Sequence, residues 1–452
     1  MSSPPLTPPS KDPTSERNYR FQQTGTPCEW AESYRPGGFH PVHLGDIFNG
    51  RYEAIRKLGN GSFGTVWLAH DGAASRYVAL KIEVSTRRKP NELGIQQLLA
   101  KRASEDPGSR HVVNLLDSFY QDGPNGSHLC LVFEPMGPSL SSVLNAPVEI
   151  YDPLNPPVRR FEMAKTKRIL RQVLLGLRFL HDSGVVHGDL QSGNVLFALQ
   201  DLSRFGREAL KQKTDKSRID PVQRIDGKLD KWAPRYLVVS EPLSEYALSG
   251  SDEVVKLSDL GEDRRYSGII TSPGNDSEKK SIGTGIDTWS FGCLVFELIT
   301  GVALFQIPPF GLSDEAVKDT HLIQMTDILG PLPDDLLENW PARSKYYGPE
   351  GERLDARPRD FDEDESDGDD VSDHEDIEEE FDDEEDFDFD MGNRGPPMVY
   401  DSLEKLINTH KPAGVNDEEE KQIIGLLRSI FHYNSDKRPS VAVLLQNCWI
   451  NS

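Results

Sequence analysis

Residues 186–196 read VHGDLQSGNVL, and this stretch decides the fold assignment. Asp189 and Asn194 stand five residues apart, after a long amphipathic segment and before an apolar run. A carboxylate can orient a hydroxyl and accept its proton, and an amide oxygen can bind a hard cation such as Mg²⁺. A turn rich in Asp, Gly and Asn has a similar composition. The apolar residues on both sides, at 185–186 and 195–197, make a solvated turn the weaker interpretation.

A second carboxylate follows at Asp259, after the apolar run 254–257 and before Gly261. Asn194 and Asp259, together with triphosphate oxygens, would suit Mg²⁺, which takes few protein carboxylates and is often bound to phosphate. We interpret His187 as a packed structural histidine.

Upstream, residues 59–66 read GNGSFGTV, which is G-x-G-x-x-G-x-V between two predicted strands. Glycines there let backbone amides approach phosphate oxygens, although a structural turn has the same pattern. A dinucleotide-binding fold needs a helix directly after the third glycine, whereas residues 65–69 predict a strand. The order favours a glycine-rich hairpin that lies over phosphates.

Lys81 ends the apolar run 78–80. Such a lysine is often only a surface residue with a buried stem, but a phosphate loop needs a cation to hold the α and β phosphates. Glu92, early in the next predicted helix, is the natural partner of Lys81. The alternative is a first-turn glutamate stabilised by the helix dipole.

Around these motifs a β-rich part precedes a helical part. Apolar periodicity predicts strands at 51–58, 65–69, 76–84, 112–119 and 129–134, the first three as an antiparallel meander, and helices at 91–102, 160–181, 287–300, 418–431 and 440–449. We predict an α+β fold with a small antiparallel lobe over 31–135, including an N-terminal extension, and a larger helical lobe over 136–452. A long spacer insertion without periodicity occupies 198–253.

Charge is unevenly distributed along the 452 residues. The net charge is −24, but residues 360–390 contain 21 Asp and Glu and no Lys or Arg, so the rest of the chain carries about −3. This balance argues against a general nucleic-acid binder. We predict that residues 1–30, rich in Pro, Ser and Thr, are a disordered tail and that 360–390 is a disordered acidic insertion.

The cysteine and apolar patterns point to an intracellular protein. The four cysteines are scattered singly, which argues against a disulfide framework or a cysteine zinc site. No apolar run of about 20 residues exists and the start of the chain lacks a signal-peptide pattern. We therefore expect a location in the cytoplasm, the nucleus or both, without membrane contact; the oligomeric state stays open.

The motifs occur in one order, which carries a family resemblance. A glycine hairpin, V-A-x-K, a helical Glu, H-x-D-x-x-x-x-N, D-x-G and D-x-W-S-x-G follow one another from residue 59 to 292, and over about 34–450 the chain resembles a eukaryotic protein kinase. The stretches YRPGGFHPVHLGDIFNGRYEAIRKLGNGSFGTVWLA (34–69) and DPGSRHVVNLLDSFYQDGPNGSHLCLVFEPMG (106–137) resemble the SR-protein kinase family. So do Asp-Leu-Gly at 259–261 and the long spacer, while HGDLQ and the acidic insertion resemble its fungal branch.

The resemblance implies a two-lobed protein-kinase fold and an ATP- and Mg²⁺-dependent kinase that phosphorylates Ser or Thr in Arg/Ser-rich proteins. It implies three catalytic residues, Asp189 as the base together with Lys81 and Gln191. It also implies Asn194 and Asp259 as metal ligands. The implied ATP contacts are Leu58, Gly59, Gly61, Gly64, Val66, Ala79, Lys81, Glu92 and the hinge residues Glu134 and Met136. The expected partner is a protein substrate and not a nucleic acid.

Three departures from the family put the activity in question. Gln191 stands where such kinases place a lysine, and the loss of one charged donor costs on the order of 10²–10³ in rate by analogy with oxyanion holes. Residues 262–282 contain no A-P-E motif, so either the activation segment is divergent or a short exon is absent. Arg438 would then lack its usual partner, and a buried unpaired arginine is costly.

The third departure is the short connection between Lys81 and Glu92. Only ten residues separate them, fewer than usual, so the predicted helix 91–102 is expected to lack a turn at its start.

Two functions therefore remain open. The first is the kinase; the second is a weakly active or inactive pseudokinase scaffold that keeps nucleotide binding and binds basic proteins through its acidic segment. The acidic segment itself has three interpretations: a solvated insertion, a docking segment for basic Arg/Ser-rich substrates, or a pseudo-ligand in the substrate groove.

Overall fold

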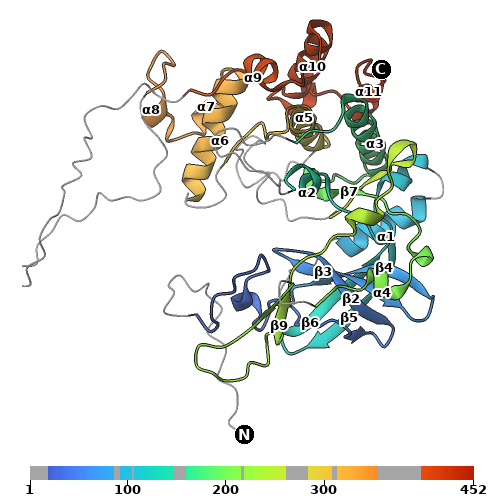
Figure 1. Cartoon of the computed structure of the whole chain (residues 1–452). Helices are drawn as coiled ribbons and strands as arrows, with labels where there is room; N and C mark the ends of the chain where they lie inside the picture. The colour runs from blue at the N-terminus through green and yellow to red at the C-terminus, as the bar shows by residue number, and fades with distance from the viewer. Residues whose placement is uncertain are drawn as a thin grey trace, which may run out of the picture.

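The computed structural model describes residues 19–85, 92–103, 106–146, 159–214, 218–260, 283–307, 313–354 and 399–452. Within them the chain forms a sheet-rich lobe and a helical lobe, which lie one above the other in Figure 1. The predicted α+β architecture, with a small antiparallel lobe before a larger helical one, is confirmed. The acidic segment 360–390 and the altered segment 262–282 lie outside the described residues.

The small lobe is built on one six-stranded antiparallel sheet with the order β1-β2-β3-β4-β6-β5. Its strands are β1 (Ile47–Phe48), β2 (Tyr52–Gly61), β3 (Gly64–Asp71), β4 (Arg76–Glu83), β5 (Leu115–Gly123) and β6 (Gly126–Phe133). Strands β2, β3 and β4 form the predicted antiparallel meander, and β1, which was not predicted, pairs antiparallel with β2. Helix α1 (Glu92–Arg102) separates β4 from β5 along the chain, and β6 then pairs with β4 while β5 takes the edge.

The large lobe is organised around α5 (Gly285–Thr300). This helix is apolar on nearly every side, and twelve of its sixteen residues are buried, as expected for a helix in the middle of a domain. It packs against α3, α9 and α10. The helices of this lobe are α2 (Leu140–Leu144), α3 (Met163–Asp182), α5, α6 (Asp314–Leu329), α7 (Asp334–Glu338), α8 (Arg343–Tyr346), α9 (Leu403–His410), α10 (Asp417–Ile430) and α11 (Val441–Leu444). Helix α11 is shorter than the predicted 440–449.

A short two-stranded ribbon in the large lobe lies next to the cleft between the lobes. Strands β7 (Val195–Phe197) and β10 (Val255–Leu257) pair antiparallel. Asn194 and Asp259 lie just outside this ribbon, and Ser258 N donates to the Asn194 carbonyl at 2.9 Å. The pairing therefore brings together two residues that are 65 positions apart.

Residues 19–30, which we predicted as part of a disordered tail, fold against the small lobe. Phe21 is buried, and the Arg20 side chain donates to the Glu32 carboxylate at 2.9 Å and to the Tyr34 carbonyl at 2.8 Å. The prediction was wrong here because it counted apolar side chains. Buried ion pairs and hydrogen bonds hold this segment, and Phe21 adds one apolar contact in a cluster with Tyr34, Phe39 and Leu237.

The spacer 198–253 is also ordered, apart from residues 215–217, which are not described. It contains α4 (Arg207–Leu210), β8 (Ile219–Pro221) and β9 (Tyr236–Val238), and it runs along the small lobe in Figure 1. Four of its apolar residues share one cluster with the sheet residues Ile55 and Leu68: Leu202, Leu210, Leu243 and Tyr246. The chain thus leaves the large lobe after β7, covers the sheet and returns at β10.

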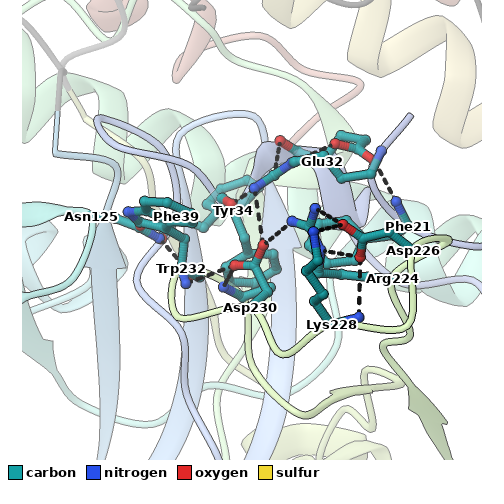
Figure 2. Close-up of polar contacts among 12 residues, drawn as sticks. Phe21, Glu32, Tyr34, Phe39, Asn125, Arg224, Asp226, Lys228, Asp230 and Trp232 are labelled. Carbon is teal, nitrogen blue, oxygen red and sulfur yellow. Dashed lines mark hydrogen bonds and ion pairs between the residues drawn. The ribbon is translucent and has the colours of Figure 1, made fainter. Parts of the chain in front are cut away.

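Polar contacts join the spacer to the N-terminal segment. Figure 2 shows Arg224 between Asp226 and Asp230, with Nη1 2.9 Å from the Asp230 carboxylate. Asn125 donates through Nδ2 to the carbonyls of Phe39 and Trp232, at 2.6 and 2.8 Å. These contacts link three parts of the chain that are distant in sequence.

The charged side chains of Lys57 on β2 and Glu29 form an ion pair, with 0% and 4% of their side-chain surface exposed. The hydroxyl of Tyr34 donates to the other oxygen of Glu29 at 2.5 Å. Every polar atom of the Glu29 carboxylate therefore has a partner, which a buried charge requires.

Among the helices that the structure describes, none combines the length and the apolar character needed to cross a membrane.

We predict that Glu29→Ala lowers the free energy of unfolding by about 3–5 kcal/mol, because it leaves the charge of Lys57 buried without a partner. Arg178→Ala is the matched control: Arg178 pairs with Asp182 at 3.4 Å on the exposed face of α3, and its loss should cost less than about 1 kcal/mol. Urea unfolding followed by circular dichroism measures both. Equal effects of the two substitutions would contradict the structural role of the Lys57–Glu29 pair.

Candidate functional site

A cavity of about 620 Å³ lies between the lobes, and all fourteen residues predicted for the site line it. The small lobe contributes the glycine hairpin, part of β4 and the start of α1. The large lobe contributes the loop 189–194 and Asp259. The predicted site residues around the cavity are Leu58, Gly59, Gly61, Gly64, Val66, Ala79, Lys81, Glu92, Glu134, Met136, Asp189, Gln191, Asn194 and Asp259.

The roof is the hairpin between β2 and β3, where Gly61 pairs with Gly64. A Cβ atom on Gly64 would lie 2.5 Å from the Ile82 carbonyl oxygen, so this position excludes a side chain. A Cβ on Gly59 or Gly61 would meet nothing within 4 Å. The backbone of the hairpin is therefore accessible from the cavity, as a phosphate-binding loop requires.

Lys81 joins three elements at the centre of the site. Its Nζ lies 2.8 Å from Glu92 Oε2 in α1 and 2.5 Å from Asp259 Oδ1 after β10. Burial alone would lower the pKa of Lys81, but the Glu92 and Asp259 carboxylates raise it above its usual value, so the amine stays charged. The predicted Lys81–Glu92 pair is present: Glu92 is the first residue of α1, and its carboxylate reaches Lys81.

The loop after α3 holds the carboxylate of Asp189. Asn194 Nδ2 donates to Asp189 Oδ2 at 2.8 Å and to the Asp189 carbonyl at 2.9 Å, and Gln191 Nε2 donates to the same Oδ2 at 3.0 Å. Both amides thus fix one oxygen of the carboxylate. Within the described residues, Asp189 Oδ1 accepts no hydrogen bond, which leaves it available to a substrate hydroxyl.

The loop is anchored to α5 by Asp287. This carboxylate accepts the backbone N–H groups of His187 and Gly188, at 2.9 and 2.8 Å, and lies 2.8 Å from His181 Nε2. Gly188 has a φ of +81°, a conformation that favours glycine. Burial lowers the pKa of His187, which keeps its ring neutral and agrees with a structural histidine.

Sequence reasoning missed two residues of this anchor. Ser192 Oγ in the loop donates to Glu297 Oε1 in α5 at 2.7 Å. Burial raises the pKa of Glu297, and the hydrogen bond from Ser192 lowers it only in part. The signal in the sequence is a glutamate within the otherwise largely apolar helix α5.

Arg438 has partners, contrary to the expectation from the missing motif. Its guanidinium donates to the carbonyls of His432, Gly285 and Tyr433, at 2.7, 2.8 and 3.1 Å, and lies 4.8 Å from the centre of the Trp289 ring. Burial lowers the pKa of Arg438 to about 10. Backbone oxygens, which sequence patterns do not reveal, replace the expected carboxylate.

The donor set fits a Mg²⁺-nucleotide. The Asn194 amide donates through Nδ2, so its oxygen is left for a cation, and Asp259 supplies one carboxylate with a left-handed φ of +61°. Mg²⁺ is usually bound by one or two carboxylates together with phosphates. In the described part of the chain no group of three or more His, Cys, Asp and Glu is placed to hold a metal on its own.

Comparisons with known proteins agree with this geometry. Residues 52–211 match the protein kinase domain family. The chain is 32% identical over 344 residues to the serine/threonine-protein kinase SRPK of Physarum polycephalum, covering 72% of this chain and 77% of that protein. It is 27% identical over 398 residues to protein kinase dsk1 of Schizosaccharomyces pombe, and this match covers 68% of this chain and 71% of that protein. A solved kinase domain superposes with a TM-score of 0.50 at 21% identity, covering 90% of this chain and 98% of that one, which bears on the fold alone.

We predict that Asp287→Asn accelerates amide hydrogen exchange in residues 185–196 at least tenfold, because an amide NH₂ cannot accept the two backbone N–H groups that a carboxylate accepts. Asp201→Asn is the control, since Asp201 is exposed and accepts the N–H of Ser203 outside this loop. Mass spectrometry of the exchanged peptides gives the readout. Unchanged protection in Asp287→Asn would refute the anchoring role.

Proposed function

The chain belongs to the SR-protein kinase family of serine/threonine protein kinases, and on that premise we propose that it transfers the γ-phosphate of Mg²⁺-bound ATP to serine or threonine in Arg/Ser-rich proteins. The protein-kinase fold expected from the motif order is confirmed. The scaffold alternative receives no support from the relatives, which are named as kinases.

One observation carries the proposal: Lys81, Asp189, Asn194 and Asp259 converge on the cavity beneath the glycine hairpin. When bound, Mg²⁺-ATP would supply the phosphoryl group and a cation that neutralises its charge. The hairpin amides and Lys81 would hold the phosphates, and Asn194 and Asp259 the metal. The backbone of residues 134–136 would contact the base, because the Glu134 carboxylate is already bound by Lys256 Nζ at 2.7 and 2.8 Å.

Asp189 performs the proton chemistry in this proposal. Its Oδ2 is fixed by Asn194 and Gln191, and its free Oδ1 orients the substrate hydroxyl and accepts the proton as the oxygen attacks phosphorus. Asp287 and Glu297 hold the loop that carries Asp189, so the base is positioned before substrate arrives.

Gln191 supports Asp189 but supplies no charge. In the family's usual pattern a lysine neutralises the transferring phosphate, whereas here the amide spends a donor on Asp189 Oδ2. The site therefore positions its base well but stabilises the developing negative charge less than a lysine would.

Charge supports a basic substrate. The net charge of −24 comes mostly from the acidic segment 360–390, and its carboxylates attract cationic peptides at moderate salt. A related protein is named SRSF protein kinase 3 in Homo sapiens, 37% identical over 185 residues, covering 39% of this chain and 31% of that protein.

Asp189→Asn should lower kcat on an Arg/Ser-rich peptide by about 10²–10⁴, because asparagine cannot accept the proton. Incorporation of ³²P from Mg²⁺-ATP is the measurement, and Asp201→Asn is the control for a surface aspartate. Equal incorporation by wild type and Asp189→Asn would assign the signal to contamination and leave the scaffold function standing.

Gln191→Lys should raise kcat roughly 10- to 100-fold with little change in the KM for ATP, because it adds a cation where negative charge develops. Steady-state kinetics of the two proteins side by side test this. A fall in kcat would mean that the Gln191–Asp189 hydrogen bond matters more than the missing charge.

A further inference from the structure

A second cavity, of about 560 Å³, lies against the connection between the lobes. Glu134 and Met136 line both cavities, so residues 134–136 separate this second cavity from the candidate active site. The spacer forms much of its wall through residues 198–203. Neither the family motifs nor the proposed phosphotransfer uses it.

Three cations line the second cavity, each from a different element: Arg76 at the start of β4, Arg110 in the 3-10 turn 107–111 and Lys256 in β10. Nearby carboxylates neutralise the positive charge of these three side chains only in part. Lys256 pairs with Glu134, but Arg76 shares the Asp71 carboxylate with Arg51.

Arg110 has no carboxylate partner within the described chain. Its exposed side chain donates from Nε to His111 Nε2 at 3.1 Å. His111 cannot compensate, because burial lowers its pKa, and the neighbouring Arg110, Lys256 and Arg171 lower it further. The ring is neutral, and the cations around it create a positive potential.

The rest of the lining is mostly apolar: Tyr77, Pro135, Met136, Leu199, Leu202 and Val254. Only two acids line the cavity, Glu134 and Asp201. An apolar cavity with an excess of cations selects a ligand with an apolar group flanked by negative charge.

The chain itself contains such a ligand. Residues 378–385 read EEEFDDEE, which places Phe381 between three acids on one side and four on the other. The whole segment 360–390 has 21 acids and no Lys or Arg. We propose that this acidic segment binds the second cavity, with Phe381 against its apolar lining and neighbouring carboxylates on Arg76, Arg110 and Lys256.

The connections are long enough. Leu354 and Val399 are the described residues on either side, 27 and 18 positions from Phe381. At about 3.3 Å per residue, 18 positions reach about 60 Å, more than the roughly 50 Å diameter of a domain of this size. Because Lys256 also holds Glu134 in the hinge, binding here is coupled to the wall of the active site.

The test uses the full chain with benzoylphenylalanine in place of Tyr77. Trypsin cleaves after Arg359 and Arg394, so the acidic segment is recovered as one fragment, 360–394. After irradiation we expect a cross-link to this fragment at a yield independent of protein concentration. Raising NaCl from 50 to 500 mM should reduce the yield severalfold, because the contacts are charged and partly exposed.

Matched variants separate the specific contact from general attraction. Arg110→Glu and, independently, Phe381→Ala should each reduce the cross-link at least fivefold, whereas Lys213→Glu, at an exposed lysine of the spacer outside the cavity, should leave it unchanged. Benzoylphenylalanine at the exposed Tyr120 should not capture the fragment. Asp189→Asn should cross-link like wild type, so the result does not depend on kinase activity.

Three outcomes would overturn the proposal: absence of the cross-link, the same yield in Arg110→Glu, or a yield that rises with protein concentration. The last would mean that the segment binds a second copy of the chain.

Discussion

The ammonium group of Lys81 holds the two lobes in register. It contacts Glu92 in α1 and Asp259 after β10, so one buried cation ties the sheet, the helix of the small lobe and the large lobe to a common point. Removal of either acid would leave less compensation for a charge that burial disfavours. The Lys256–Glu134 pair and the backbone hydrogen bond from Val113 to Leu257 add further contacts between the lobes.

The loop 189–194 depends on a second set of carboxylates, which lie outside the proposed active site. Asp287 accepts two backbone N–H groups, Glu297 accepts the hydroxyl of Ser192, and both acids stand on the buried helix α5. The helix cannot move without disturbing the core of the large lobe. This rigid support keeps the Asp189 carboxylate in place. Its Oδ2 is held by hydrogen bonds, and its Oδ1 stays available to the proposed substrate hydroxyl.

Buried ion pairs also explain why the small lobe includes residues 19–39 and the spacer in addition to its sheet. The Lys57–Glu29 and Arg20–Glu32 pairs, together with the Asn125 hydrogen bonds, fasten residues 19–39 and the spacer to the strands. Such pairs add specificity of position, since each requires one partner at one place, whereas apolar contacts tolerate sliding. The spacer then does more than connect β7 to β10: it covers the sheet and forms a wall of the second cavity.

Hydrophobic periodicity predicted most of the secondary structure, and motif spacing predicted the glycine hairpin, Lys81, Asp189, Asn194 and Asp259, because both are properties of neighbouring residues. The hinge residues Glu134 and Met136 followed only from the family resemblance. The order of the motifs predicted the kinase fold and family, which are confirmed. Only the tertiary structure decided that residues 19–30 are ordered, that Arg438 is satisfied by carbonyls and that Glu297 supports the loop. Each of these depends on atoms that are remote in sequence, and the composition of a segment carries no record of which distant donor or acceptor it will meet.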